Sequence, residues 1–313
     1  MVRWPEGMRW PRLRLPGGLR PWVGAACALL LGLALVTHGR EVLALAPDRR
    51  GWGLLLLGLG FTGLAQWSNA LAWWGVLGWL GCGEPVADVL PLYVRTTPLK
   101  YLPGGVWHLL GRLRWLQARG RPGRQALAAV VLDPLLMAVA ALTLVPFGGL
   151  QAGLGLVSPL AVLLLRPRWL QPLLQRLTAG KRRLLDDPAS EGAVLAPADW
   201  PWKPLLLELP FLGFRFAGFA CCLLSFSAAV PPGWGPWLGG FALAWTAGLV
   251  VPGAPGGLGV FELVLLARLR GAVPTAELLA VLVSYRLISV LAEGLAAAAV
   301  LLDDRLAAAR NNR

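Results

Sequence analysis

Six charged side chains lie within stretches of this sequence that are otherwise almost entirely apolar: Asp133, Glu208, Arg215, Glu262, Arg286 and Glu293. At membrane depth such a group costs roughly 2.5–3.5 kcal/mol on insertion scales, so it is expected to pair, bind a ligand or carry a proton. Arg286 and Glu293 are seven residues apart, too far for a direct pair on one helix. Their partners should lie on other helices, and we expect Arg286 to pair with Glu262. A purely structural ion pair is the alternative for each.

Two Pro-Gly-Gly segments interrupt apolar runs, namely Pro103-Gly104-Gly105 and Pro255-Gly256-Gly257, and the second continues to Gly259. Proline removes a backbone donor and glycine weakens a helix, so both helices should break there. A helix that restarts after a break directs free N–H groups into it, which suits an anion. Glu262 should lie in the first turn of the second restarted helix. Paired interruptions are typical of transporter binding sites, and ordinary loops between spans are the alternative.

The composition indicates that membrane-spanning helices hold these residues in place. Of the 313 residues 57% are hydrophobic, and several apolar runs approach or exceed the length that a spanning helix needs. We therefore predict an all-α fold, a polytopic transmembrane helix bundle of about seven or eight spans, with an internal repeat as one interpretation of the paired interruptions. The expected spans are 22–36, 52–80, 125–146, 150–165, 205–230, 237–251 and 276–302.

The remaining sequence consists of short polar segments around a single membrane domain. We expect a basic arm, the membrane domain and a polar tail at residues 1–21, 22–302 and 303–313. The largest polar loop, 166–204, contains Trp169, Leu173 and Leu177 at helical spacing beside basic residues. This pattern predicts an amphipathic helix at the membrane interface.

The net charge of +13 places basic residues beside the spans instead of on a separate soluble face. Nucleic acid is therefore a poor partner, whereas anionic lipid headgroups on the cytoplasmic side explain the pattern. The arm at 1–21 and the arginine-rich stretch 84–124 should both face the cytoplasm. We expect a multi-pass protein of the plasma (inner) membrane.

The sequence offers little support for catalysis or for a cofactor. His38 and His108 form no metal-binding pattern, and the four cysteines show no metal or redox spacing. A nucleotide-binding motif and a Ser-His-Asp arrangement are also not visible in the sequence. We therefore expect no metal, no cofactor and no enzyme activity.

Two blocks of this sequence resemble the lysylphosphatidylglycerol synthase transmembrane-domain family, a flippase-like membrane family. The first runs from Lys100-Tyr101-Leu102-Pro103-Gly104-Gly105 through Arg112 to the helix of Asp133, and the second from Pro255 to Glu262 and on to Tyr285-Arg286. With the spacing between them, the resemblance covers residues 20–302. The family often has a base and a second acid after the position of Asp133, where this chain has Pro134 and Met137. The resemblance therefore carries no acid–base relay onto this helix.

The blocks and interruptions together supply the candidate substrate-binding residues. These are Lys100, Tyr101, Pro103, Gly104, Gly105, Arg112, Asp133, Pro255, Gly256, Gly257, Gly259, Glu262, Tyr285 and Arg286. Backbone N–H groups at the glycines would bind a phosphate, and Arg112 and Arg286 would add charge-assisted hydrogen bonds. Asp133 and Glu262 would hold those arginines or exchange protons.

The resemblance implies a protein that moves an anionic phospholipid or a lipid-linked intermediate between membrane leaflets. Characterised relatives carry this module fused to a soluble aminoacyl-transferase domain, which this sequence does not contain, so lipid aminoacylation is not implied. One alternative is a non-catalytic accessory or scaffold subunit that binds envelope-biosynthesis proteins. Another is an intramembrane enzyme that modifies lipid headgroups.

Overall fold

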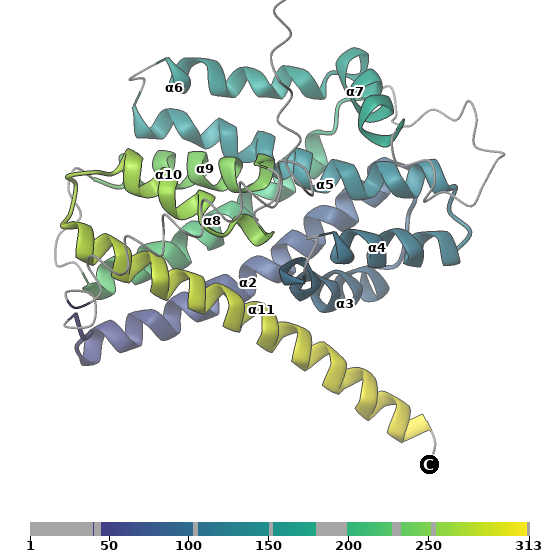
Figure 1. The fold of residues 1–313 in the computed structure, drawn as a ribbon. Coiled ribbons are helices and arrows are strands. Elements are labelled where there is room, and N and C mark those ends of the chain that lie inside the picture. Colours follow the sequence, from purple (N-terminus) through teal and green to yellow (C-terminus); the bar gives the residue numbers. More distant parts are fainter. Residues whose placement is uncertain are drawn as a thin grey trace, which may run out of the picture.

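The computed structural model describes residues 40, 45–102, 106–149, 153–179, 199–226, 233–251 and 255–311. Within these ranges the protein is all-helical and contains no strand, as predicted (Figure 1). Three predicted features lie outside the described residues. They are the basic arm at 1–21, the first expected span at 22–36 and the Pro-Gly-Gly segment at 103–105.

The helices form two consecutive groups. The first comprises α2 (Arg49–Trp79), α3 (Val86–Thr96), η1 (Thr97–Tyr101), α4 (Trp107–Ala118), α5 (Gly123–Leu144), η2 (Val145–Gly148), α6 (Leu154–Val157), η3 (Ser158–Leu165) and α7 (Pro167–Ala179). The second comprises α8 (Trp202–Phe226), α9 (Trp234–Val250), η6 (Pro255–Gly257), α10 (Val260–Arg268) and α11 (Thr275–Asn311).

Among the described residues, four helices are long and apolar enough to cross a membrane: Arg49–Trp79, Gly123–Gly148, Trp202–Phe226 and Thr275–Ala307. Each overlaps one of the predicted spans. The expected span at 150–165 contributes a shorter apolar helix, Gly155–Leu165, and its η3 part packs along α5. The total of seven or eight spans stays a prediction.

Helix α2 shows the surface expected of a helix that faces lipid. Its polar residues Thr62 and Gln66 are buried, whereas Leu56, Leu57 and Leu64 are more than half exposed. This order is the reverse of that in a water-soluble helix, and it suits an apolar surrounding with polar contacts kept between helices. Helix α2 packs along α8 more extensively than any other described pair of elements.

The buried apolar residues of the described chain form two hydrophobic cores. One joins residues of α2, α3, α4, α5, η3, α7 and the start of α8, around Trp73 and Leu116. The other is rich in aromatic rings and joins α8 to α11 around Phe219, Phe241 and Tyr285. The polar side chains of the candidate site lie between these two cores.

The second Pro-Gly-Gly segment interrupts the helical path as the residue types require. Gly256, Gly257 and Gly259 have φ angles of 61°, 73° and 81°, in the left-handed region that favours glycine. Helix α10 then begins at Val260. On either side of the first interruption, η1 ends at Tyr101 and α4 begins at Trp107.

The predicted amphipathic helix of the polar loop is present as α7. Its buried residues are Leu170 and Leu174, which the predicted pattern did not include, whereas Trp169 is 52% exposed. At about 100° per residue, these two leucines extend the predicted face of Trp169, Leu173 and Leu177, and this single apolar face packs against the bundle. The polar tail expected at 303–313 is helical as far as Asn311, because α11 continues and projects from the bundle (Figure 1).

Candidate functional site

A cavity of about 720 Å³ lies between the two cores. Eight of the fourteen predicted site residues line it, and these are Lys100, Tyr101, Arg112, Asp133, Gly256, Gly257, Tyr285 and Arg286. Gly259 and Glu262 lie behind this lining, in the turn that begins α10. Pro255 begins η6, while Pro103, Gly104 and Gly105 lie outside the described residues.

The segments beside the two interruptions meet at the cavity. A Cβ atom added to Gly256 would lie 2.9 Å from Cε1 of Tyr101, so η6 and η1 are packed tightly against each other. The residues at the two helix starts, Val106 before α4 and Phe261 in α10, line the same cavity. The chain thus brings two sequence-distant segments to one site.

Arg112 on α4 forms the first ion pair of the site. Its Nη1 donates to Oδ2 of Asp133 at 3.0 Å, while Nε and Nη2 donate to the hydroxyls of Thr96 and Thr97 at 3.2 and 3.1 Å. The guanidinium carbon lies 3.4 Å from the ring centroid of Tyr93, whose hydroxyl donates to the same Asp133 oxygen. Because all three nitrogens have partners and Arg112 is 2% exposed, this arginine chiefly joins α3, α4 and α5.

Arg286 on α11 forms the second pair, with Glu262. Its Nε donates to Oε1 of Glu262 at 2.9 Å, and its Nη1 donates to the carbonyl of Gly256 at 3.1 Å. The second oxygen of Glu262 accepts a hydrogen bond from the Gly259 N–H at 2.7 Å. The predicted pairing and the predicted place of Glu262 in the first turn of α10 are both confirmed.

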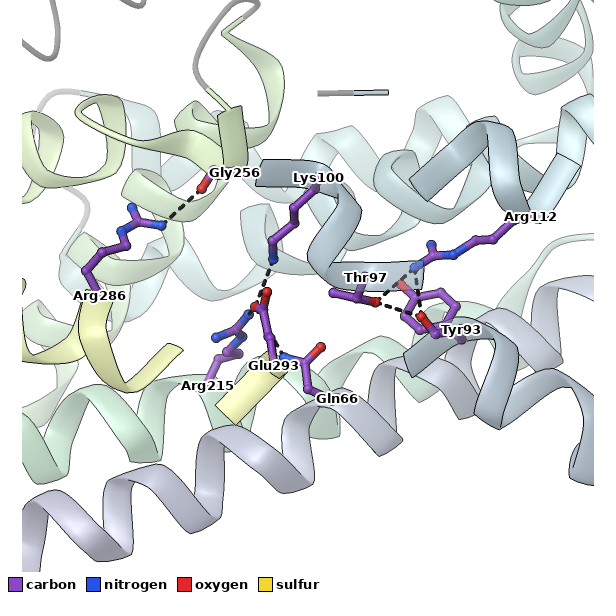
Figure 2. A network of polar contacts seen from close by, with 9 residues as sticks. All are labelled: Gln66, Tyr93, Thr97, Lys100, Arg112, Arg215, Gly256, Arg286 and Glu293. Atoms are coloured by element: carbon purple, nitrogen blue, oxygen red, sulfur yellow. Dashed lines mark hydrogen bonds and ion pairs between the residues drawn. The ribbon is translucent and has the colours of Figure 1, made fainter. Parts of the chain in front are cut away.

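The third ion cluster joins Lys100, a predicted site residue, to Arg215 and Glu293, which were not predicted to belong to the site (Figure 2). Glu293 on α11 accepts from Lys100 Nζ at 2.8 Å and from Arg215 Nη2 at 2.6 Å. Gln66 on α2 donates to the same oxygen at 3.4 Å. The sequence identifies Arg215 and Glu293 as charged residues within apolar stretches that need partners. Only the fold shows that Glu293 pairs with both Arg215 and Lys100.

The charges around the cavity do not balance. Four cationic side chains, Lys100, Arg112, Arg215 and Arg286, face three paired carboxylates, Asp133, Glu262 and Glu293. One positive charge is therefore left over in this network. A partly enclosed site with such an excess attracts anions.

Glu208 on α8 stands apart from these ion pairs. It is fully buried, and neither carboxyl oxygen has a hydrogen-bond partner in the part of the chain that the structure describes. Burying an isolated ionised carboxylate is very costly. We therefore do not count Glu208 among the charges that balance the cavity.

The rest of the cavity lining is largely apolar and aromatic. Phe211, Trp245, Phe261 and Met137 all contribute to it. A cavity with a polar cluster and an apolar wall fits an amphiphilic ligand better than a small hydrophilic one. Among the described residues, no group of three or more His, Cys, Asp or Glu side chains could hold a metal ion.

A separate ionic cluster lies at the end of the bundle, where α2 connects to α3. Glu84 there contacts Arg119 at 2.8 Å and Arg121 at 2.7 Å. Burial raises the pKa of the Glu84 carboxyl, but hydrogen bonds from the two arginines outweigh burial and the net effect is a lowered pKa. Some of the arginines in 84–124 thus join the α2–α3 connection to the α4–α5 connection.

No protein-family model matches this sequence, and neither does any curated protein. In the part of the chain that the structure describes, the fold and the site define an all-helical bundle with four helices long and apolar enough to cross a membrane and a charged cavity between helices.

Proposed function

We propose that this protein moves an anionic phospholipid or a lipid-linked intermediate between the leaflets of the plasma membrane. The observation that carries the proposal is the central cavity, which combines an apolar wall with a network of ion pairs that has one excess positive charge. The headgroup would occupy the charged part, and the acyl chains would lie along the apolar part. The resemblance to the flippase-like family points in the same direction.

Arg112 and Arg286 were both predicted from the sequence to donate hydrogen bonds to a phosphate, whereas in this proposal their roles differ. Arg286 lines the cavity with its side chain 20% exposed, so it can contact a headgroup. Arg112 is 2% exposed and its nitrogens are engaged, so it acts as a positioning residue that fixes α4 against α3 and α5. Asp133 and Glu262 hold their respective arginines.

The proposal has a direct test in vesicles that contain only this protein. Fluorescent phosphatidylglycerol would be placed in both leaflets, and the outer leaflet would be bleached by an impermeant reductant. We expect the protected inner pool to become accessible faster in vesicles with the protein than in empty ones. Arg286→Gln should abolish this exchange. The control Arg95→Gln, which removes the exposed pair with Asp304, should not.

Two results would contradict the proposal. Exchange at the rate of empty vesicles, with the protein folded and inserted, would favour the accessory or scaffold function. New lipid species in the vesicles, detected by mass spectrometry, would favour a headgroup-modifying enzyme.

A further inference from the structure

Arg215 differs from the other two arginines of the cavity in having unused donors. It is 3% exposed, and only its Nη2 donates to a partner, Oε1 of Glu293. Its Nε and Nη1 are buried without a hydrogen-bond partner among the residues that the structure describes. A guanidinium has five N–H donors in a fixed plane, and buried donors are nearly always satisfied. Arg215 therefore has buried N–H donors for which the described chain supplies no acceptor.

Aromatic rings hold Arg215 at the cavity wall. Its guanidinium carbon lies 5.1 Å from the ring centroid of Trp245 and 5.8 Å from that of Phe211. All three residues line the cavity. Contact with a ring face uses the face of a guanidinium and leaves the N–H groups at its edge available for an acceptor.

The excess positive charge of the cavity belongs to this same cluster. Arg112 and Arg286 each have a carboxylate of their own, whereas Arg215 and Lys100 share the single carboxylate of Glu293. Two positive charges, those of Lys100 and Arg215, thus face one negative charge, and the cluster has a net charge of one positive unit. The unused donors and the unmatched charge therefore coincide.

One face of α11 adds hydroxyl groups to this place. Tyr285, Ser289 and Glu293 are spaced four residues apart, so they follow one another along a single face of the helix. Tyr285 and Ser289 line the cavity together with Lys100 and Arg215. Hydroxyl donors beside a guanidinium and an ammonium are a set typical of sites that bind phosphate oxygens.

We propose that Arg215 and Lys100, with the hydroxyls of Tyr285 and Ser289, bind one singly charged phosphodiester group of the lipid. This assignment rests on the proposed function. A phosphodiester carries one negative charge and matches the single excess positive charge, whereas a phosphomonoester carries about 1.5 to 2 negative charges at neutral pH. The site should therefore prefer lipids joined through a phosphodiester to those that end in a free phosphate.

The test measures lipid binding to the purified full-length protein in detergent by competition with fluorescent phosphatidylglycerol. The competitors are phosphatidylglycerol, phosphatidic acid, diacylglycerol, which has no phosphate, and water-soluble glycerophosphoglycerol. We expect phosphatidylglycerol to compete best. Arg215→Gln should reduce its advantage over diacylglycerol by about tenfold, the loss of roughly one charged hydrogen bond. Arg215→Lys should restore part of it, and the control Arg95→Gln should change nothing.

A second variant tests the charge count independently of Arg215. Glu293→Gln removes the shared carboxylate and raises the excess from one positive charge to two. We expect this variant to improve the competition by phosphatidic acid relative to phosphatidylglycerol. Ser289→Ala, a small change at the same site, should weaken phosphatidylglycerol binding with the melting temperature unchanged.

The outcomes separate this inference from the proposed function. If the wild type moves phosphatidylglycerol across vesicles but Arg215→Gln and Glu293→Gln keep its lipid preference, the assigned binding residues are wrong and the function stands. If the wild type shows the preference but does not move lipid, the site is supported and the transport function is wrong. Equal competition by glycerophosphoglycerol and phosphatidylglycerol would show that the site binds the phosphodiester and not the lipid, which would overturn the lipid assignment.

Discussion

The three ion clusters of the cavity differ in how completely their side chains are satisfied. Arg112 donates from all three nitrogens, and Arg286 shares a carboxylate with the start of α10. Arg215 retains two nitrogens without partners in the described chain. Three arginines that line one cavity thus have different roles: one positions helices, one links α11 to α10, and one has donors left for a ligand.

The pair of Glu262 and Arg286 provides the first prediction. Removing one charge of a buried pair leaves the other uncompensated, at a cost of about 3–5 kcal/mol. Glu262→Gln and Arg286→Gln should therefore each abolish lipid exchange. The double variant should be less impaired than the sum of the two losses, with a coupling of about 0.5–3 kcal/mol.

The vesicle assay, at equal protein levels, measures this cycle. The exposed pair Arg95 and Asp304 is the matched control, with its two side chains 38% and 51% exposed, and its double-mutant cycle should show little coupling. Additive losses for Glu262 and Arg286 would show that they act independently. Full activity of Glu262→Gln would assign this residue a purely structural role.

The second prediction concerns Glu84 and pH. Its pKa is lowered from a usual value of 4.5, so its ion pairs stabilise the folded protein above that pH and are lost as the pH falls through the lowered value. At pH 7, Glu84→Gln should lower the melting temperature by roughly 1–3 °C, as expected for pairs near the surface. The wild type and the variant should converge as the pH falls below the lowered pKa of Glu84.

Thermal unfolding in detergent across this pH range measures the effect of Glu84. Asp303→Asn, which removes an exposed carboxylate of α11, is the control and should follow the wild type. A difference between Glu84→Gln and the wild type that persists unchanged at acid pH would mean that the ion pairs are not its cause.

At the scale of elements, the helices approach one another through small residues. A Cβ atom added to Gly239 of α9 would lie 2.4–2.7 Å from backbone atoms of Gly148 and Val145 in η2. The neighbouring Gly240 would meet only side-chain atoms of α10 and its C-terminal end, at 3.5 Å or more. The close contact of α9 with η2 therefore depends on one glycine and not on the next.

The third prediction follows from this contrast. Gly239→Ala should destabilise the protein by about 1–3 kcal/mol or more, because backbone cannot move aside as a side chain can. Gly240→Ala adds the same methyl group one residue along, in ordinary contact, and should change stability far less. Melting temperatures of the two variants at equal detergent measure the difference. Equal effects would show that α9 and η2 are not packed this closely.

At the scale of the whole molecule, the cavity is lined by helices from both halves of the described sequence, which pack closely against each other through α2 and α8. Residues from α2 to α5 and from α8 to α11 both line it. In the proposed function, a lipid has to reach this cavity from both sides of the membrane. The direction of that access depends on the orientation of the protein in the membrane.

The fourth prediction tests this orientation. If the arginine-rich stretch 84–124 faces the cytoplasm, a cysteine at the exposed residue Ala118 of α4 should resist an impermeant thiol reagent in intact cells and react after permeabilisation. The four native cysteines would be replaced first. A second variant with cysteine at Asp303 reports the side on which α11 ends. Labelling of Ala118→Cys in intact cells would reverse the proposed orientation.

The sequence by itself determined the class of fold and part of the site. Apolar runs of sufficient length predict helices because an unpaired backbone is too costly in hydrocarbon, and four of the predicted spans correspond to long apolar helices. The place of Glu262 in the first turn of α10 follows from local pattern, because the glycines set where the helix begins. Its pairing with Arg286 on α11 was predicted because a carboxylate at membrane depth needs a cationic partner.

Only the tertiary structure decided how the charges are combined. Lys100, Arg215 and Glu293 come from η1, α8 and α11, which are distant in sequence, and no periodicity relates one helix to another across a bundle. The face of α7 that is buried, Leu170 and Leu174, likewise depends on what packs against it. Ion pairs across a bundle depend on the relative depth and rotation of helices, and packing against neighbouring helices sets both.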